Sequence, residues 1–243
     1  MKDKKVLIVK NISHEDAGLF EDILKENNIL YDVVDLSIGE KFPNPKGYSA
    51  IMVFGGPDSA NDDTQKMKDE LKRIEESVDA KIPFLGICLG LQTLVKAMGG
   101  NVRKNGVKEV GCRDAKGNFF EIKLTKNGKS DPIFRGLDPK LRTFHLHGET
   151  VDILPEMTLL ATGEYCKNQA VRIGKNAYGL QGHFELTKSK LKIWMANDED
   201  LKKTNSETLL KDYNNLELEL ELELENNARK IFANFLKISN LTS

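Results

Sequence analysis

One cysteine of the chain lies where sulfur chemistry is possible. Residues 82–100 read IPFLGICLGLQTLVKAMGG, in which an apolar strand runs directly into Gly86-x-Cys88-x-Gly90 and then into a helical pattern. This is the layout of a nucleophile elbow, where small residues two positions to either side let strand and helix pack closely. Unpaired N–H groups at the helix start would favour the thiolate. The pattern predicts that Cys88 is a nucleophile, although a buried structural cysteine between two glycines would fit it as well.

A second segment contains the partners that such a thiol needs. Residues 178–185 read YGLQGHFE, a strand-like pattern in which His183 and Glu185 stand two apart and therefore point to the same side. A histidine base held by a carboxylate activates a cysteine nucleophile. Taken alone, His183 would fit an ordinary surface or core histidine, so its interpretation as a base depends on Glu185 and Cys88.

The third segment, residues 54–59, reads FGGPDS and directly follows an apolar strand. Glycines at this place would leave backbone N–H groups bare near the nucleophile, where they could stabilise the anion of a tetrahedral intermediate. Without the other two segments, this one would be interpreted only as a turn.

In this order, GGPDS, PFLGICLGLQ and YGLQGHFE resemble the motifs of class I (triad) glutamine amidotransferases, and HGETV at 147–151 resembles their HGD-type segment. The resemblance is nearest to stand-alone proteins similar to the glutaminase domain of GMP synthase. It implies that Cys88 attacks the side-chain amide of glutamine, forms a γ-glutamyl thioester and releases ammonia. His183 would be the general base and acid, and Glu185 would hold its tautomer.

The same resemblance implies the remaining site residues. The backbone N–H groups of Gly56 and Leu89 would form the oxyanion hole. Three further residues would contact the substrate: Gly55, Gln92 and, through its backbone, His147. Glutamine, or another γ-glutamyl amide, is the implied substrate.

Two positions depart from the family pattern, which has an aromatic residue before the catalytic histidine and a proline after it. Here these residues are Gly182 and Phe184. Gly182 would suit a roomier pocket for the leaving amine, so a γ-glutamyl hydrolase or peptidase acting on other γ-glutamyl amides is the alternative function. A non-catalytic regulatory module is a third possibility, which the intact Cys/His/Glu set disfavours.

The elements that must position these residues follow an α/β pattern. Short apolar runs at 5–10, 29–36, 50–54 and 82–87 alternate with helical spacings that open at Ser13 and span Thr64–Val78. Such strands need cover on both faces. We therefore predict an α/β fold: a mostly parallel, twisted, flavodoxin-like sheet with helices on both faces, binding its ligand at the carboxyl ends of the strands.

Residues 102–185 change to strand-like segments separated by turns, at 119–124, 143–154, 170–173 and 178–184, which we expect to form hairpins and extend the same sheet. We predict an amidotransferase-like domain over residues 1–187, the resemblance covering Lys5 to Thr187. Residues 188–243 are expected to form a helical extension packed on that domain, partly through Trp194.

The extension contains five successive Leu-Glu dipeptides, Leu216–Glu225. Their period of two is nominally that of a strand, but both residues are strong helix formers, so we predict a helix. The segment is either an insertion without a function of its own or a contact for an oligomer or partner.

Composition excludes several classes of protein. The chain has 243 residues, 40% of them hydrophobic and 30% charged, and a formal net charge of -1, which suits a globular protein and gives no excess of cations for nucleic acid or a membrane surface. The apolar run Val6–Val9 is too short for a signal peptide or a membrane span, so we expect a cytoplasmic protein.

We expect neither a metal nor a cofactor. The three cysteines form no CxxC pair, and His145-x-His147 has no third ligand at a suitable spacing. The chain has no Walker A loop, and GGPDS is not the SGGxDS loop of ATP pyrophosphatases, so we expect that it does not activate an acceptor itself. A separate synthetase would then receive the ammonia.

Overall fold

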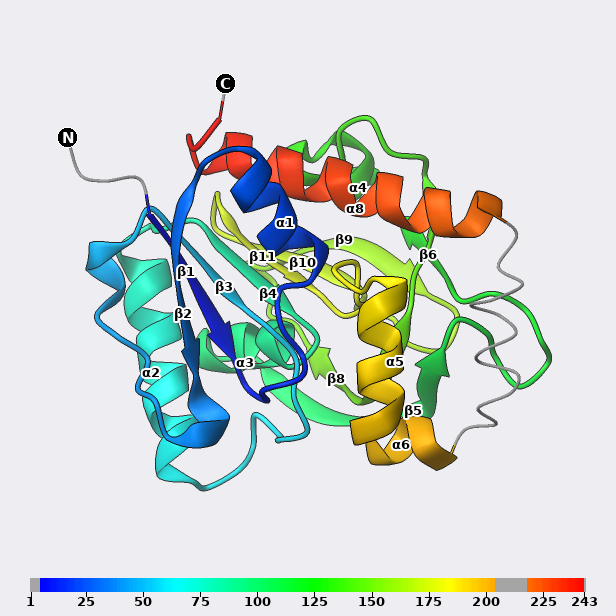
Figure 1. The fold of residues 1–243 in the computed structure, drawn as a ribbon, viewed down its shortest axis with the longest axis horizontal. Helices are drawn as coiled ribbons and strands as arrows, with labels where there is room; N and C mark the ends of the chain where they lie inside the picture. The colour runs from blue at the N-terminus through cyan, green and yellow to red at the C-terminus, as the bar shows by residue number, and fades with distance from the viewer. Residues whose placement is uncertain (1–4, 204–217, 243) are drawn as a thin grey trace.

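The computed structural model describes residues 5–203 and 218–242, and for residues 218–222 it describes the backbone alone. A nine-stranded mixed sheet with strand order β2-β1-β3-β4-β11-β10-β9-β6-β7 runs through the molecule (Figure 1). Its parallel half consists of β1 (Lys5–Lys10), β2 (Leu30–Asp35), β3 (Ala50–Val53), β4 (Phe84–Ile87) and β11 (Ala177–Leu180). Its antiparallel half adds β10 (Ala170–Ile173), β9 (Thr158–Gly163), β6 (Glu121–Leu124) and β7 (Lys140–Arg142).

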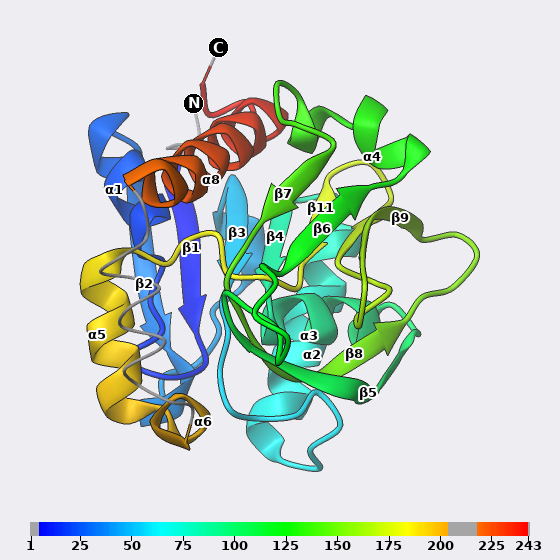
Figure 2. The same ribbon diagram turned by 90° about the vertical axis from the view of Figure 1, so that its right-hand side faces the viewer.

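Helices cover both faces of the parallel half (Figure 2). In β1, Val6 and Ile8 join the core beneath α1 and α8, whereas Leu7 and Val9 join the core beneath α2 and α3, so every residue of this apolar run is buried. The predicted α/β sheet with helices on both faces is thereby confirmed. The helices are α1 (Leu19–Glu26), α2 (Gln65–Asp79), α3 (Leu89–Ala97), α4 (Lys126–Ser130), α5 (Lys188–Asn197), α6 (Glu199–Lys203) and α8 (Leu218–Ile238).

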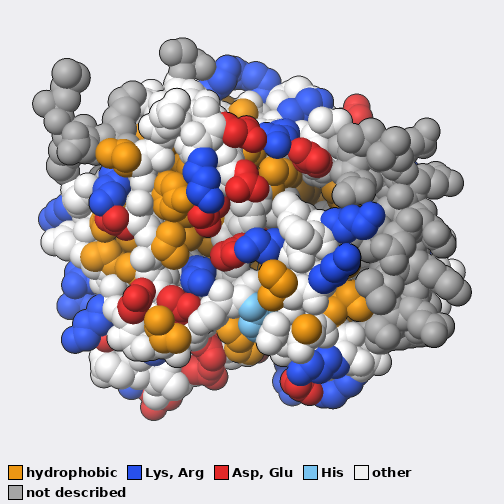
Figure 3. All heavy atoms as spheres, in the orientation of Figure 1, with side chains coloured by type: hydrophobic (Ala, Val, Ile, Leu, Met, Phe, Trp, Pro, Cys, Tyr) orange, Lys and Arg blue, Asp and Glu red, His pale blue; other side chains and the backbone are white. Residues whose placement is uncertain are grey.

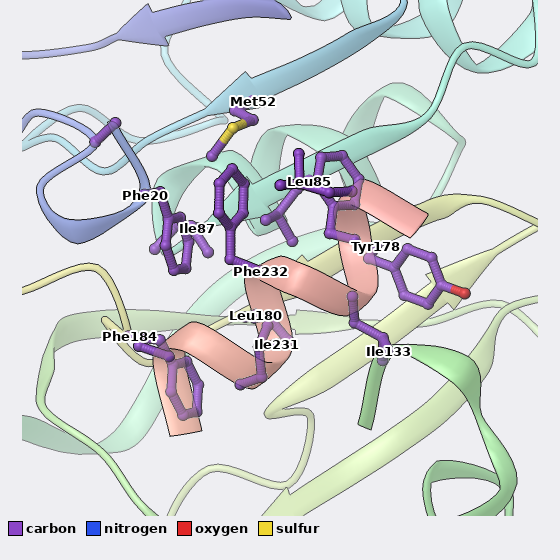
Figure 4. Packing of buried hydrophobic residues seen from close by; sticks show 14 of the residues in the cluster. Phe20, Met52, Leu85, Ile87, Ile133, Tyr178, Leu180, Phe184, Ile231 and Phe232 are labelled. Carbon is purple, nitrogen blue, oxygen red and sulfur yellow. The ribbon is translucent and has the colours of Figure 1, made fainter. Parts of the chain in front are cut away.

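The C-terminal helix α8 shares the main core of the domain. Phe232 stacks on Phe20 of α1 with ring centroids 4.6 Å apart and lies near Ile87 and Leu180 (Figure 4). The helix prediction for the Leu-Glu repeat is confirmed from residue 218 onward, and residues 216 and 217 lie outside the described part. The packing partner of α8 is this chain's own sheet.

Three local predictions are wrong. First, the segment 143–154 does not extend the main sheet as expected, because its strand β8 (His145–Asp152) pairs with β5 (Asn101–Gly111) in a separate two-stranded sheet. Second, α1 begins at Leu19 rather than at Ser13, because the Ser13 hydroxyl donates to Asp35 and does not cap a helix. Third, β11 ends at Leu180, and the segment with the expected catalytic histidine follows the strand.

The surface matches the charge balance of the sequence. On the face shown in Figure 3, basic and acidic side chains are intermingled. Within the described residues, no helix combines the length and the apolar composition that crossing a membrane requires.

Candidate active site

Cys88 occupies a strained elbow between β4 and α3. Its φ of 53° and ψ of -106° lie outside the comfortable range of an L-residue, and α3 begins at the next residue. The flanking glycines are required: a Cβ on Gly86 would lie 2.2 Å from the carbonyl oxygen of Gly90, and one on Gly90 would lie 2.1 Å from that of Val53. The sequence therefore builds the nucleophile elbow that its spacing predicts.

His183 and Glu185 form a buried pair beside this elbow. The Nδ1 atom of His183 lies 2.8 Å from the Glu185 Oε1 atom, and both side chains are 1% exposed. The pair is not held by β11 as expected; instead, the amide of His183 donates to the carbonyl oxygen of Phe144 and the amide of Leu19 to that of Glu185. Two neighbouring segments thus fix the imidazole and its carboxylate.

The electrostatics of the pair favour a charged imidazole. Burial alone would lower the pKa of His183, but the nearby Glu185 carboxylate and Cys88 sulfur raise that pKa well above its usual value. The Nε2 atom of His183 is buried without a nitrogen or oxygen partner among the described residues, and the Cys88 side chain is close enough to interact with the ring as a hydrogen-bond partner. An imidazole oriented in this way can exchange a proton with a group beside the sulfur.

The sulfur of Cys88 has only weak partners. Its thiol donates to the Leu146 carbonyl oxygen at 3.6 Å and accepts from Gln181 Nε2 at the same distance. The side chain is 5% exposed and lines a cavity of about 510 Å³. The sulfur is therefore accessible to a small substrate.

Backbone amides suited to an oxyanion lie in the same cavity. Gly56 and Leu89 both line it, and in the described part of the chain neither amide donates a hydrogen bond. Asn11 supports the glycine loop: its amide group donates to the Phe54 carbonyl oxygen, and a Cβ on Gly56 would lie 2.7 Å from the Asn11 Cβ. This is a water-accessible pair of donors at the elbow.

Comparison with known proteins shows the family to which the chain belongs. The model of the family "Glutamine amidotransferase class-I" matches residues 20–201. A glutamine amidotransferase from Thermotoga maritima superposes with a TM-score of 0.83 at 31% identity, over 98% of this chain and 100% of that one. The chain belongs to the class-I glutamine amidotransferase family.

Two curated relatives refine the placement. The chain is 30% identical over 197 residues to one subunit of the glutamine-hydrolysing GMP synthase of Methanosarcina acetivorans, a match that covers 78% of this chain and 92% of that one. It is 29% identical over 189 residues to the glutamine amidotransferase-like protein YfeJ of Salmonella typhimurium, with 75% and 76% covered. The similarity to GMP synthase glutaminase components agrees with the motifs.

In this class-I amidotransferase, the expected substrate residues differ in their surroundings. Gln92 lines the cavity and donates from Nε2 to the Glu149 carbonyl oxygen at 3.3 Å. His147 also lines it, but both ring nitrogens face protein atoms, Nδ1 lying 2.9 Å from the Glu149 carbonyl oxygen and Nε2 lying 2.9 Å from Glu109 Oε2. Its ring is therefore engaged, and only its backbone is left for a substrate.

Gly55 has a steric role. A Cβ at this position would lie 2.3 Å from Glu15 Oε2 and 3.0 Å from His183 Cε1. A side chain at Gly55 would therefore displace either the His183 imidazole or the Glu15 carboxylate.

Gly182 does not enlarge the pocket, contrary to the expectation from the sequence. A Cβ at this position would lie 2.5 Å from the Thr143 Oγ1 atom and 2.8 Å from its Cγ2 atom. The buried side chain of Thr143 already fills the space that an aromatic neighbour of the histidine would need. Any breadth of substrate choice must come from elsewhere in the cavity.

Among the described residues of the amidotransferase, one donor set could hold a metal. Glu109 on β5 pairs in register with His147 on β8, and together with His145 it presents ligand atoms within 4.8 Å of one another. The sequence expectation that the two histidines lack a third ligand is therefore wrong, because strand pairing brings Glu109 from a distant segment. Burial lowers the pKa of His145 well below its usual value, which keeps that ring neutral.

Two residues that sequence reasoning did not assign to the site complete it. Glu15 is 5% exposed and lines the cavity from the loop between β1 and α1. Trp194 of α5 packs edge-on against the His183 ring, with centroids 4.9 Å apart, and donates from Nε1 to the His14 carbonyl oxygen. The rule that ligands bind at the carboxyl ends of parallel strands could have identified the loop of Glu15, which directly follows β1.

Proposed function

We propose that this protein hydrolyses the side-chain amide of glutamine through a γ-glutamyl thioester on Cys88. The observation that carries the proposal is a His183 ring that Glu185 holds at Nδ1 and that interacts with the side chain of Cys88, a cysteine in a nucleophile elbow. This is the base, the orienting carboxylate and the nucleophile that acyl transfer requires.

The residues act in sequence. The Cys88 sulfur, its proton passed to His183, attacks the amide carbon of glutamine, and the amides of Gly56 and Leu89 stabilise the resulting oxyanion. The carbon–nitrogen bond then breaks as His183 returns the proton to nitrogen, so ammonia leaves and the thioester remains. Finally, His183 takes a proton from water, the hydroxide attacks the thioester, and glutamate leaves as the proton returns to sulfur.

A separate synthetase is the proposed recipient of the ammonia. The relative in Methanosarcina acetivorans is named as one subunit of a GMP synthase, and the chain spans only 31% of the undivided GMP synthase of Lactobacillus acidophilus. The proposed compartment is the cytoplasm, because Cys88, Cys112 and Cys166 are all free thiols, which a reducing compartment preserves.

The test is release of glutamate and ammonia from glutamine by the purified protein. We expect turnover that Cys88→Ala abolishes and that Cys112→Ala, a change of another buried thiol, retains. An electrophilic glutamine analogue should modify Cys88 alone, as peptide mass spectrometry would show. Equal rates for the wild type and Cys88→Ala would refute the thioester mechanism.

A further inference from the structure

The carboxylate of Glu15 lies near the imidazole of His183. A Cβ atom added to Gly55 would lie 2.3 Å from Glu15 Oε2 and 3.0 Å from His183 Cε1, so both groups border the same small space. Glu15 also lines the cavity that contains Cys88 and is 5% exposed. Its side chain is therefore a buried acid directed into the reaction chamber.

This acid has no partner among the described residues. In the part of the chain that the structure describes, Glu15 makes no hydrogen bond and no ion pair, and its surroundings act on it only through burial and the charges of His183, Glu185 and Asp198. Burial raises the pKa of Glu15 to about 7. Burying a carboxyl group without a hydrogen-bond partner lowers the stability of the folded protein, so we expect this residue to have a functional role.

The rest of the cavity wall is also acidic. Six of its lining side chains are carboxylates: Glu15, Asp58, Glu149, Asp198, Glu199 and Asp200. Three of them are neutralised by lysines, since Asp58 pairs with Lys66, Glu199 with Lys202, and Asp200 with Lys108.

The remaining carboxylates have no lysine partner but differ in their hydrogen bonds. The Glu149 carboxylate accepts from the Ser59 hydroxyl, and its backbone carbonyl accepts from Gln92 Nε2. Asp198 accepts through Oδ1 from the amides of Asp200 and Leu201, and its charge acts on Glu15. In the described structure, neither Glu15 nor Asp198 has a lysine or arginine partner, and the charge that acts most strongly on Glu15 is that of the His183 imidazole.

The leaving amine must lie on the His183 side. During thioester formation His183 gives its proton to the departing nitrogen, so that nitrogen is within hydrogen-bond reach of the imidazole. Any group attached to that nitrogen extends into the cavity that Glu15 lines, near the imidazole. The burial of this carboxylate, and the lysine pairing of the carboxylates elsewhere in the cavity, favour a positive charge on that group.

We propose that Glu15, aided by Asp198, binds an ammonium group carried by the leaving amine, so that besides glutamine the site hydrolyses the mono-γ-glutamyl amide of an aliphatic diamine. The inference rests on the proposed thioester chemistry and changes only the amine that departs. Water and the amide give glutamate and the free diamine, with no further reactant.

The kinetic test compares three amides: the mono-γ-glutamyl amide of 1,4-diaminobutane, the uncharged γ-glutamyl butylamide of the same chain length, and glutamine. We expect kcat/KM for the diamine amide to exceed that for the butylamide at least about tenfold, the ratio that one ion pair in a partly dry site can give. Glu15→Gln should lower this ratio to about 2 or less, mainly through KM for the diamine amide.

Controls separate the inference from the proposed function. Glu199→Gln changes a carboxylate of the same cavity that is already paired, with Lys202, so it should keep the wild-type ratio. Thermal unfolding of Glu15→Gln should show a folded protein. Similar kcat/KM values for the two alkyl amides, or an unchanged ratio in folded Glu15→Gln, would overturn the diamine inference while leaving the thioester chemistry intact. Absence of any Cys88-dependent turnover would instead refute the proposed function.

Discussion

Two buried His–Glu pairs lie near the cavity, and they are built differently. In one, His183 Nδ1 faces Glu185 at 2.8 Å and the other nitrogen of the ring is left for the Cys88 side chain. In the other, His147 Nε2 faces Glu109 at 2.9 Å while its Nδ1 atom faces the Glu149 carbonyl oxygen. Both pairs are almost fully buried, so burial and distance alone do not separate them.

The difference lies in which nitrogen is left over. A carboxylate on Nδ1 leaves Nε2 free to exchange a proton, whereas a ring with protein acceptors at both nitrogens has no site for chemistry. The comparison predicts that the reactive histidine is the one whose second nitrogen is left for the cysteine. We expect the first pair to govern the rate and the second to hold the HGETV strand in place.

The largest effect is expected from the two histidines themselves. His183→Asn should lower kcat by about 10⁴-fold, since the base and the acid are lost together. His147→Asn should lower kcat by less than about tenfold, because its ring takes no part in proton transfer. Steady-state kinetics on folded variants would measure both, and equal losses would break the distinction between the pairs.

Replacing the orienting carboxylate should cost less than replacing the base. In Glu185→Gln we expect kcat to fall by about 10²- to 10⁴-fold, because the amide favours the wrong tautomer and no longer stabilises the charged ring. The loss of the carboxylate should also lower the pKa of His183, which its charge raises in the native protein. NMR titration of the ring would measure this shift, and an unchanged pKa would contradict the role of Glu185.

The His147–Glu109 pair should affect the free energy of unfolding more than the rate. Glu109→Leu should reduce the free energy of unfolding by about 3 to 5 kcal/mol, because it leaves His147 Nε2 buried opposite an apolar group. Urea unfolding would measure the change, with the exposed strand residue Glu121, replaced by Leu, as the control. A large loss of kcat in Glu109→Leu that remained folded would place this pair in the chemistry.

Glu15 adds a further difference between the two His–Glu pairs. This acid, which has no hydrogen-bond partner in the described chain, lies near the His183–Glu185 pair. Its pKa is raised from 4.5 to about 7 by burial, so the native state holds the proton more tightly than the unfolded chain. Stability contributed in this way is complete below pH 4.5 and is lost as the pH rises through about 7.

The pH test uses the difference between the wild type and Glu15→Gln. On raising the pH from 4.5 to 8, the wild type should lose roughly 2 to 3 kcal/mol more free energy of unfolding than the variant. Subtracting the profile of the variant from that of the wild type reduces the part of the pH dependence that comes from His183, Glu185 and Asp198, the titratable groups that act on Glu15. Parallel profiles would show that Glu15 is ionised with equal ease in both states.

The smallest effect should come from the ring that covers His183. Trp194→Phe keeps an aromatic edge against the imidazole but removes the hydrogen bond to the His14 carbonyl oxygen. We expect a loss of about 1 kcal/mol in stability and a fall in kcat of about two- to fivefold. Chemical denaturation and kinetics would measure these, and a loss as large as that of Glu185→Gln would make Trp194 part of the machinery.

The sequence predicted those features that depend on neighbours in the chain. The elbow at Cys88 follows from two glycines and an adjoining strand and helix, and the apolar runs of the parallel half follow from burial on both faces. The pairing of His183 with Glu185 was foreseen, but the reason was wrong, because Phe144 and Leu19 hold that segment and not β11.

Features that depend on distant segments were missed. Glu109 reaches His147 only because β5 and β8 pair across an intervening stretch of chain, and the sequence does not specify which strands pair. The space beside Gly182 is occupied by Thr143, a contact that no motif records. Glu15 lay in a segment assigned to a helix, although the Ser13 bond to Asp35 makes it a loop.

The position of Trp194 bears on how the protein is made. A ribosome delivers the strained Cys88 long before it delivers His183, Glu185 and the indole that covers the imidazole. During synthesis the thiol is therefore present before its expected base. The order of translation means that the site is complete only after α5 has been synthesised and has packed against the His183 ring.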